Sequence, residues 1–386
     1  MHKRMGLWGV VLILAGGGGG EVQVASSSGY LNGVARLMAG MDPGEAGFEK
    51  LTTSPTWTDH QAFFEKNWAA LSKKRLDPAR DWAATDVKPD PSLQTLFYPF
   101  SGPDFMNAYL FFPDCDTYVF YSLEAPGVPP SVRKLSDSDY ANLLTDIRES
   151  MDDIFQRQYF ITKRMMKELR TPVLRGNAPL IMIFMARMNL DILSVENVRI
   201  GSDGTLRVSS STAIGALAKR AAANPVPGVR ITFRRPEGKT QTLVYLSVDV
   251  SDKGLASHPE FLTYLSQGGT GISFMKSASY LLHGSNFSKI RASVLRSTRY
   301  LLQDDSGLPY RAFGKGGWTV TLYGRYTNAI KDFGGTIQQD LADAYTATEP
   351  ARLLPFTFGY HWWDKHSNIQ IAVKDTEPAT PANPKK

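Results

Sequence analysis

Residues 95–124 read TLFYPFSGPDFMNAYLFFPDCDTYVFYSLE, and this stretch gives the clearest indication of the fold. Two runs rich in β-branched and aromatic residues, 95–100 and 117–123, predict strands. Between them, Gly102 permits a tight reversal and Pro103 suits the first turn of a helix. The stretch therefore predicts a strand, a turn, a helix and a second strand, which together form a βαβ unit.

A later stretch weakly repeats this order. Residues 274–279 (FMKSAS) look like the end of a strand and a turn of small residues, and helices then lead to a strand at 299–303. That strand ends in Asp304-Asp305, as the earlier unit ends in Glu124. The two stretches are interpreted as Rossmann-like βαβ units, related by duplication or alike by chance.

Other strand candidates lie on either side of this second unit. Turn residues between the middle candidates indicate antiparallel neighbours. We expect an α/β fold with a single mixed sheet, Rossmann-like βαβ units, flanking helices and an antiparallel meander in the middle. The further strands are predicted at 195–200, 229–233, 242–248, 318–323 and 369–373.

The first unit resembles the opening βαβ unit of Rossmann-type proteins, methyltransferases included, where an acid at the end of the second strand binds a ribose. Glu124 occupies the corresponding place, but the Gly-x-Gly-x-x-Gly fingerprint is absent, so we expect no cofactor. Backbone N–H groups at a helix start bind anions, which makes Ser101, Gly102 and Asp104 candidate ligand-binding residues. A purely structural turn and a nucleotide site are the alternatives.

The most polar loop that follows an apolar strand spans 303–311 (QDDSGLPYR). Two adjacent carboxylates, Asp304 and Asp305, repel each other when buried, so one of them is expected to have a raised pKa and to serve as a general acid. Arg311 could pair with a carboxylate or bind an anion. Asp304, Asp305 and Glu124 are therefore the candidate catalytic residues. A solvated turn is the alternative, because Asp-Ser-Gly is good turn chemistry.

Two other motifs are weighed and set aside. Ser273 and Lys276 match the Ser-x-x-Lys nucleophile motif of serine β-lactamases and penicillin-binding proteins, but the partner motifs follow too closely to leave room for a helical domain. His361, Asp364 and His366 could offer ligands to a metal, but a spacing of five between the histidines suits neither a helix face nor a strand face. No metal site is predicted.

The N-terminus carries a targeting pattern. Lys3 and Arg4 form a positive region, and residues 7–14 form an apolar run too short to span a bilayer. Residues 14–16 (LAG) resemble the start of the lipobox in bacterial lipoprotein signals, but Gly17 replaces the cysteine that would carry the lipid. The resemblance implies export, to the periplasm or beyond, with an outer-membrane tether only if that cysteine were present.

These patterns divide the chain into four parts. We expect an export signal at 1–16, a flexible Gly/Ser-rich linker at 17–30, a single α/β globular domain at 31–374 and a disordered tail at 375–386. No linker-like change of composition interrupts the third part, and the tail contains prolines but no large apolar residue.

Composition narrows the classes of function. Of 386 residues, 42% are hydrophobic and 21% are charged, which excludes wholesale disorder. A net charge of +6 is mild for this length, so no nucleic-acid partner is predicted. A lone cysteine excludes an intramolecular disulfide.

The leading hypothesis is an exported cell-envelope protein that binds or assembles with an envelope ligand or protein. Contact with a membrane would come only through an N-terminal tether. The alternative is an envelope hydrolase with Asp304 or Asp305 as acid/base and Glu124 as a second carboxylate. The two are distinguished by whether the candidate residues converge: Ser101, Asp104, Glu124, Asp304 and Arg311.

Overall fold

The computed structural model describes residues 27–157, 174–209, 225–315, 317–330, 334–347, 351–361 and 367–375. The expected export signal, most of the expected linker and the tail after residue 375 lie outside these ranges. Helix α1 begins at Ser28, with the Ser27 hydroxyl accepting a hydrogen bond from the Tyr30 backbone N–H. Residues 28–30 were expected in the flexible linker, and that prediction is wrong because this serine cap starts the helix earlier.

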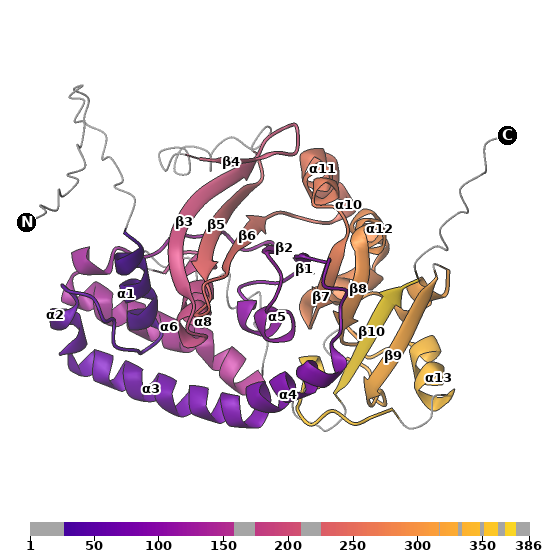
Figure 1. Ribbon diagram of the computed structural model, residues 1–386, viewed down its shortest axis with the longest axis horizontal. Helices are drawn as coiled ribbons and strands as arrows, with labels where there is room; N and C mark the ends of the chain where they lie inside the picture. The colour runs from indigo at the N-terminus through magenta and orange to yellow at the C-terminus, as the bar shows by residue number, and fades with distance from the viewer. Residues whose placement is uncertain are drawn as a thin grey trace, which may run out of the picture.

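One ten-stranded sheet organises the described chain (Figure 1). Its strand order is β4-β3-β5-β6-β2-β1-β7-β8-β10-β9. All eight predicted strands are present, although their ends differ by a few residues. The strands are β1 (Thr95–Pro99), β2 (Thr117–Ser122), β3 (Asp191–Ile200), β4 (Leu206–Val208), β5 (Pro227–Arg234), β6 (Thr240–Ser247), β7 (Gly271–Met275), β8 (Thr298–Gln303), β9 (Trp318–Gly324) and β10 (Asn368–Lys374).

The sheet is mixed. Neighbouring strands from β6 through β2, β1 and β7 to β8 run parallel. The pairs β3–β4, β3–β5 and β5–β6 are antiparallel, as are β10–β8 and β10–β9. The antiparallel excursion in the middle of the chain is therefore confirmed, and it extends one side of the parallel centre.

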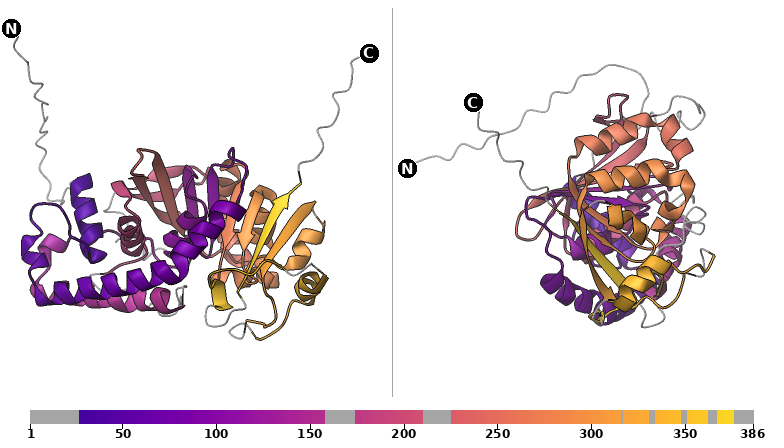
Figure 2. Two further views of the ribbon diagram at one scale, coloured as in Figure 1. Left: turned by 60° about the horizontal axis from the view of Figure 1, so that its bottom comes forward. Right: turned by 90° about the vertical axis from the view of Figure 1, so that its right-hand side faces the viewer.

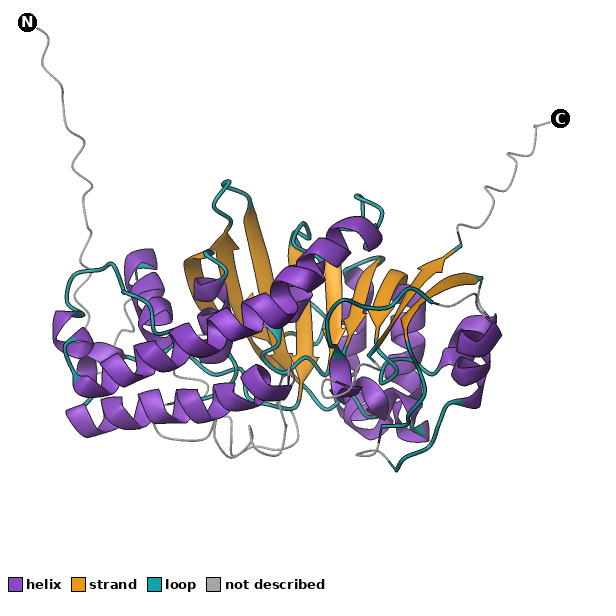
Figure 3. Cartoon of the chain, turned by 90° about the horizontal axis from the view of Figure 1, so that it is seen from below, coloured by secondary structure: helices purple, strands orange, loops and turns teal. Residues whose placement is uncertain are grey.

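Helices cover both faces of the sheet (Figures 2 and 3). Alternate residues of each strand point to opposite faces, so Leu96 and Tyr98 join one core and Phe97 joins the other. The first face packs against α1 (Ser28–Met38), α3 (Pro55–Leu71), α4 (Asp77–Asp86), α5 (Phe105–Phe111), α6 (Asp137–Arg157) and α8 (Ala178–Arg187). The second face packs against α10 (Asp252–Ser257), α11 (Pro259–Gln267) and α12 (Ser288–Ser297).

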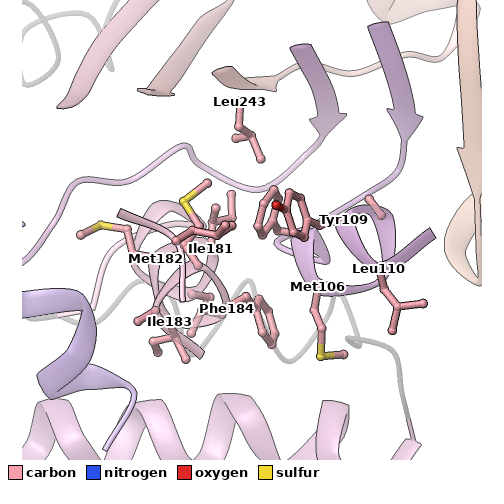
Figure 4. Close-up of a cluster of buried hydrophobic side chains, with 14 of the residues drawn as sticks. Met106, Tyr109, Leu110, Ile181, Met182, Ile183, Phe184 and Leu243 are labelled. Atoms are coloured by element: carbon pink, nitrogen blue, oxygen red, sulfur yellow. The ribbon is translucent and has the colours of Figure 1, made fainter. Parts of the chain in front are cut away.

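The first core is built around two short apolar helices, α5 and α8 (Figure 4). Every residue of α5 is buried, and so is every residue of α8 except its last, Arg187. A helix that is apolar all round must be enclosed on all sides. Leu243 of β6 closes this cluster from the sheet side. Together with the second core, this confirms the α/β fold class.

The two βαβ units leave the centre of the sheet in opposite directions. From β1 the chain passes through α5 to β2, on one side of β1. From β7, which pairs with β1 on its other side, the chain passes through α12 to β8. The strand order thus reverses between β1 and β7. In open α/β sheets such a reversal creates a crevice at the carboxyl ends of the strands.

The described residues contain no helix whose length and apolar character would let it cross a membrane.

Candidate functional site

The turn after β1 is held by a buried ion pair. Phe100 and Gly102 adopt positive φ angles of 57° and 50°, which turn the chain sharply from β1 towards α5. Asp104 caps α5, accepting hydrogen bonds from the backbone and side chain of Asn107. Its Oδ2 atom lies 2.9 Å from the Lys276 ammonium, and these two side chains are 5% and 0% exposed. The pair ties the end of β1 to the end of β7.

The same carboxylate also binds Tyr98. The Tyr98 hydroxyl donates to Asp104 Oδ2 over 3.1 Å. Burial, together with the nearby Asp104 carboxylate, raises the pKa of Tyr98 well above its ordinary value. This shift favours the protonated hydroxyl that donates the hydrogen bond to Asp104.

The turn after β7 places Ser277 in an unusual conformation. Its φ of 59° and ψ of −112° lie where residues with a side chain rarely occur, at a cost of about 1–3 kcal/mol. Its backbone N–H donates to Asp304 Oδ2 over 3.1 Å. Its hydroxyl is buried and has no hydrogen-bond partner among the described residues. Strain of this kind at a strand end, with a hydroxyl left unbonded, points to a functional serine.

The turn after β8 carries the two predicted carboxylates. Asp304 accepts hydrogen bonds from the Ser277 backbone and from both the backbone and the hydroxyl of Ser306. Burial and the neighbouring charge of Asp305 raise the pKa of Asp304 to about 7. This confirms that one member of the acidic pair has a raised pKa. The same burial means that the loop is not the solvated turn of the alternative interpretation.

Asp305 faces His361, which lies far along the chain in the short 3₁₀ helix Gly359–His361. The His361 Nε2 atom is 3.1 Å from Asp305 Oδ2, and these two side chains are 5% and 1% exposed. The same segment packs against Asp304 at Gly359. A Cβ at position 359 would lie 2.0 Å from Asp304 Oδ2, so only glycine allows this approach. Ser277 and the Gly359–His361 segment therefore both contact the same carboxylate.

The structure brings together most of the predicted site residues. Ser101, Gly102, Asp104, Asp304 and Asp305 lie at one edge of the sheet, where β1, β7 and β8 end in parallel. All five are buried rather than exposed in an open polar cleft. The loops bond to one another through the β7 turn, by the Asp104–Lys276 and Ser277–Asp304 contacts.

Two predicted residues lie apart from this cluster. Glu124 follows β2, and its backbone carbonyl accepts a hydrogen bond from the Tyr245 hydroxyl. In the described ranges no contact joins Glu124 to Asp304 or Asp305. Arg311 is exposed, and the part of the chain that is described shows no ion pair between it and a carboxylate. The expected pairing of Arg311 is therefore not formed, because its loop turns the side chain outward.

Sequence reasoning missed three members of the cluster. Lys276 and Ser277 lie within FMKSAS, which was interpreted as a strand end and a turn. Lys276 was otherwise weighed only in the rejected Ser-x-x-Lys motif, and His361 only as a metal ligand. Ser273, the serine of the rejected motif, bonds to the Thr298 hydroxyl over 2.6 Å. Asp364 and His366, the other proposed metal ligands, lie outside the described residues. Within those residues no group of His, Cys, Asp and Glu side chains is placed to hold a metal.

Several buried polar atoms in this cluster lack a hydrogen-bond partner among the described residues. Buried polar groups are normally bonded, and each exception calls for an explanation. Such exceptions occur across the described chain, and four of them lie at this edge of the sheet, where a bound ligand could complete their bonds. They are the hydroxyls of Ser101, Ser277 and Ser279 and the Oδ1 atom of Asp305.

Comparisons of the chain with protein-family models, with curated proteins and with solved structures found no match.

The site thus combines three chemical elements. A strained serine at a strand end presents an unbonded hydroxyl. A histidine bound to a buried carboxylate is the standard form of a general base with its orienting acid. The N–H groups of a turn next to a helix start can stabilise developing negative charge.

Proposed function

We propose that this protein is a hydrolase of acyl compounds, with Ser277 as the nucleophile and His361 as the general base. The observation that carries this proposal is the backbone of Ser277. A strained turn from strand to helix is the geometry on which esterases and lipases carry their nucleophilic serine. The departure from that motif is that Met275 and Ser279 stand where glycines normally flank the serine.

The order of the residues along the chain supports the assignment. Ser277 comes first, then Asp305, then His361, which is the Ser–Asp–His order of such enzymes. Ser277 lies in the turn that follows β7, a strand next to the reversal of strand order where ligands gather. Asp305 would orient His361 and stabilise its protonated form.

The reaction would proceed in two steps. The Ser277 hydroxyl has no hydrogen-bond partner among the described residues, His361 included, so this proposal requires the two side chains to come into contact when the substrate binds. The Ser277 hydroxyl oxygen would then attack the acyl carbonyl carbon while its proton passes to His361, and the protonated His361 would return that proton to the departing alcohol or amine. Water, activated by His361, attacks the acyl-serine and releases the acid and free Ser277. The turn at Ser101 and Gly102 would hold the carbonyl oxygen through backbone N–H groups and the Ser101 hydroxyl.

The other carboxylates would act as positioning groups. Asp304 fixes the strained Ser277 backbone, and the Asp104–Lys276 pair fixes the two turns relative to each other. This differs from the sequence hypothesis, in which Asp304 or Asp305 was itself the acid/base and Glu124 the second carboxylate.

We also propose that this hydrolase acts in the cell envelope. The support is the charged start, the short apolar run and the lipobox-like LAG of residues 1–16. A role in binding or assembly without catalysis is the competing proposal.

The test is covalent labelling with a fluorophosphonate, which reacts with activated serines. Wild-type protein should be labelled, and digestion with mass spectrometry should place the label on Ser277. Ser277→Ala should abolish labelling and the hydrolysis of p-nitrophenyl acetate. The matched control is Ser279→Ala. The Ser279 hydroxyl is also buried and without a hydrogen-bond partner in the described chain, but the backbone of Ser279 does not have a positive φ angle.

Labelling that persists in Ser277→Ala would overturn the assignment of the nucleophile. Wild-type protein that neither takes up the label nor cleaves any ester would overturn the hydrolase proposal and favour the binding role.

A further inference from the structure

A cleft of about 560 Å³ lies at the edge of the sheet opposite the Ser277 site. Gln94, Cys115 and Ile272 are part of its lining, and they stand at the amino ends of β1, β2 and β7. Ser277 follows the carboxyl end of β7, so the length of that strand separates it from the cleft. Clefts of about 300–1,000 Å³ are typical of sites for small molecules. The cleft is therefore a candidate binding site distinct from the proposed active site.

The helices α4 and α5 and the loop after each of them form the cleft. Ala83 and Ala84 line it from the last turn of α4, and Leu110 and Phe111 line it from the end of α5. Figure 4 shows Leu110 on the side of α5 that faces away from α8. Most of the lining is apolar, and much of it consists of rings. The two loops contribute the ring side chains of Pro89, Pro91, Phe112 and Pro113.

Neighbouring side chains hold the rings of the lining in place. The Trp82 ring packs edge-on against Phe111, with centroids 6.1 Å apart, and the Tyr300 ring packs in the same way against Phe112, at 6.0 Å. The Tyr300 hydroxyl also accepts a hydrogen bond from the Lys88 backbone N–H over 3.1 Å, which fixes the loop after α4. Proline rings have almost no side-chain freedom to lose. A preformed cleft of this kind favours a rigid ligand, because neither partner has to be ordered when they bind.

The charges around the cleft balance one another. Its lining contains two cations, Arg80 and Lys88, and two anions, Asp90 and Asp114, and all four residues are exposed. Each of them already has a partner within the chain. The partners are Asp77 for Arg80, the Ala84 carbonyl for Lys88, the Ser92 backbone N–H for Asp90 and Arg235 for Asp114. A charged ligand would give up its hydration here without gaining a buried countercharge, so the lining favours a neutral ligand.

We propose that this cleft binds a neutral aromatic molecule of about two or three rings. The volume admits a molecule of that size, and the ring-rich walls offer it apolar surface with stacked or edge-to-face contacts. A flexible hydrocarbon chain would lose rotational freedom in the same cleft, whereas a planar ring system has none to lose. The proposal does not depend on the hydrolase assignment, because the cleft and Ser277 lie at opposite edges of the sheet.

The first experiment compares three naphthalene probes by isothermal titration calorimetry on the full chain. At neutral pH, 2-naphthol is uncharged, 2-naphthoate is an anion and 2-naphthylmethylamine is a cation. One molecule of 2-naphthol should bind per chain, at least about tenfold more tightly than either charged probe. Failure of 2-naphthol to bind, or equal affinities for the three probes, would overturn the proposal.

Substitutions at two exposed alanines test the location. Ala84→Trp adds an indole ring to the wall of the cleft from the surface of α4, and it should weaken the binding of 2-naphthol at least about tenfold. The matched control is Ala70→Trp in α3, because Ala70 is also an exposed helical alanine but does not line the cleft. The control should bind as wild type does, and circular dichroism checks that both variants fold. Unchanged affinity in folded Ala84→Trp would show that the ligand binds elsewhere.

A second measurement uses Cys115, which is the only cysteine of the chain and lines the cleft. Burial raises the pKa of its thiol to about 12, so it should react slowly with the neutral reagent 4,4′-dithiodipyridine. Saturating 2-naphthol should slow this reaction severalfold in wild type and in Ala70→Trp, but not in Ala84→Trp. Binding that leaves the reaction rate of Cys115 unchanged would overturn the cleft as the site, while the hydrolase proposal would still be decided by the labelling of Ser277.

Discussion

Ser277 has a strained backbone conformation that lowers the stability of the folded protein. Its backbone lies in a region that glycine occupies without strain, yet the sequence keeps a side chain there. The surrounding contacts hold it in place, above all the hydrogen bond from its N–H to the buried Asp304 carboxylate. A position that serves only structure would be expected to carry glycine.

Ser277→Gly tests this reasoning. Glycine adopts the observed angles freely, so the variant should be more stable than wild type by about 1 kcal/mol, while the proposed activity disappears. The measurement is the free energy of unfolding in urea, with ester hydrolysis in parallel. Ser279→Gly is the control: position 279 has no positive φ, so glycine there should lower stability by about 0.5–1 kcal/mol. A less stable Ser277→Gly protein would show that the strain argument fails.

At the scale of elements, the ends of β1 and β7 depend on a buried ion pair. Lys276 and Asp104 are almost fully enclosed, so removing one partner leaves the other charge without compensation. Tyr98 binds the same carboxylate, which makes Asp104 the common acceptor of this junction.

Asp104→Ala should therefore lower the free energy of unfolding by about 3–5 kcal/mol. The double variant Asp104→Ala with Lys276→Met should recover part of this loss, because no buried charge remains. For comparison, Asp77→Ala removes the exposed Arg80–Asp77 pair and should change stability by less than about 1 kcal/mol. Equal effects of Asp104→Ala and Asp77→Ala in urea unfolding would contradict the role given to burial.

The elements also show how far the sequence could be interpreted. Strands that combine β-branched and aromatic residues were predicted, including β1 and β2, because their composition differs clearly from that of helices. The strand β7 (GISFM) was missed as a strand in its own right: it is short, buried on both faces and contains small residues, so it has no alternation. The residues of the candidate site likewise divide into those that the sequence predicted and those that it did not.

Asp104, Asp304 and Asp305 were found because polar residues at predicted strand ends converge at one sheet edge. The conformation of Ser277 could not be found, since a serine gives no sign of a positive φ. His361 could not be joined to Asp305 either, because a contact between residues distant in sequence follows only from the complete fold.

At the scale of the whole molecule, one sheet supports two large cores, one on each face, beside a smaller cluster of Leu322, Tyr326 and Leu341. The first core lies against α3, α5, α6 and α8, and the second against α11 and α12. Because every central strand contributes side chains to both, neither layer can lose its packing without disturbing the strands that the other layer needs. The proposed site lies at the edge where both layers meet the carboxyl ends of the strands.

This arrangement predicts that the two layers unfold together. Phe184→Ala in α8 removes a fully buried ring from the first core, and Phe261→Ala in α11 removes one from the second, each at a cost of about 3–5 kcal/mol. Unfolding followed by both tryptophan fluorescence and far-ultraviolet circular dichroism should give coincident transitions in each variant, with the midpoint lowered in both probes alike. If Phe261→Ala instead lowered the midpoint of only one probe, the layer of α11 and α12 would be unfolding as a separate unit. The sheet would then fail to couple the two cores, and the geometry of the site at their common edge could be lost while half of the molecule stayed folded.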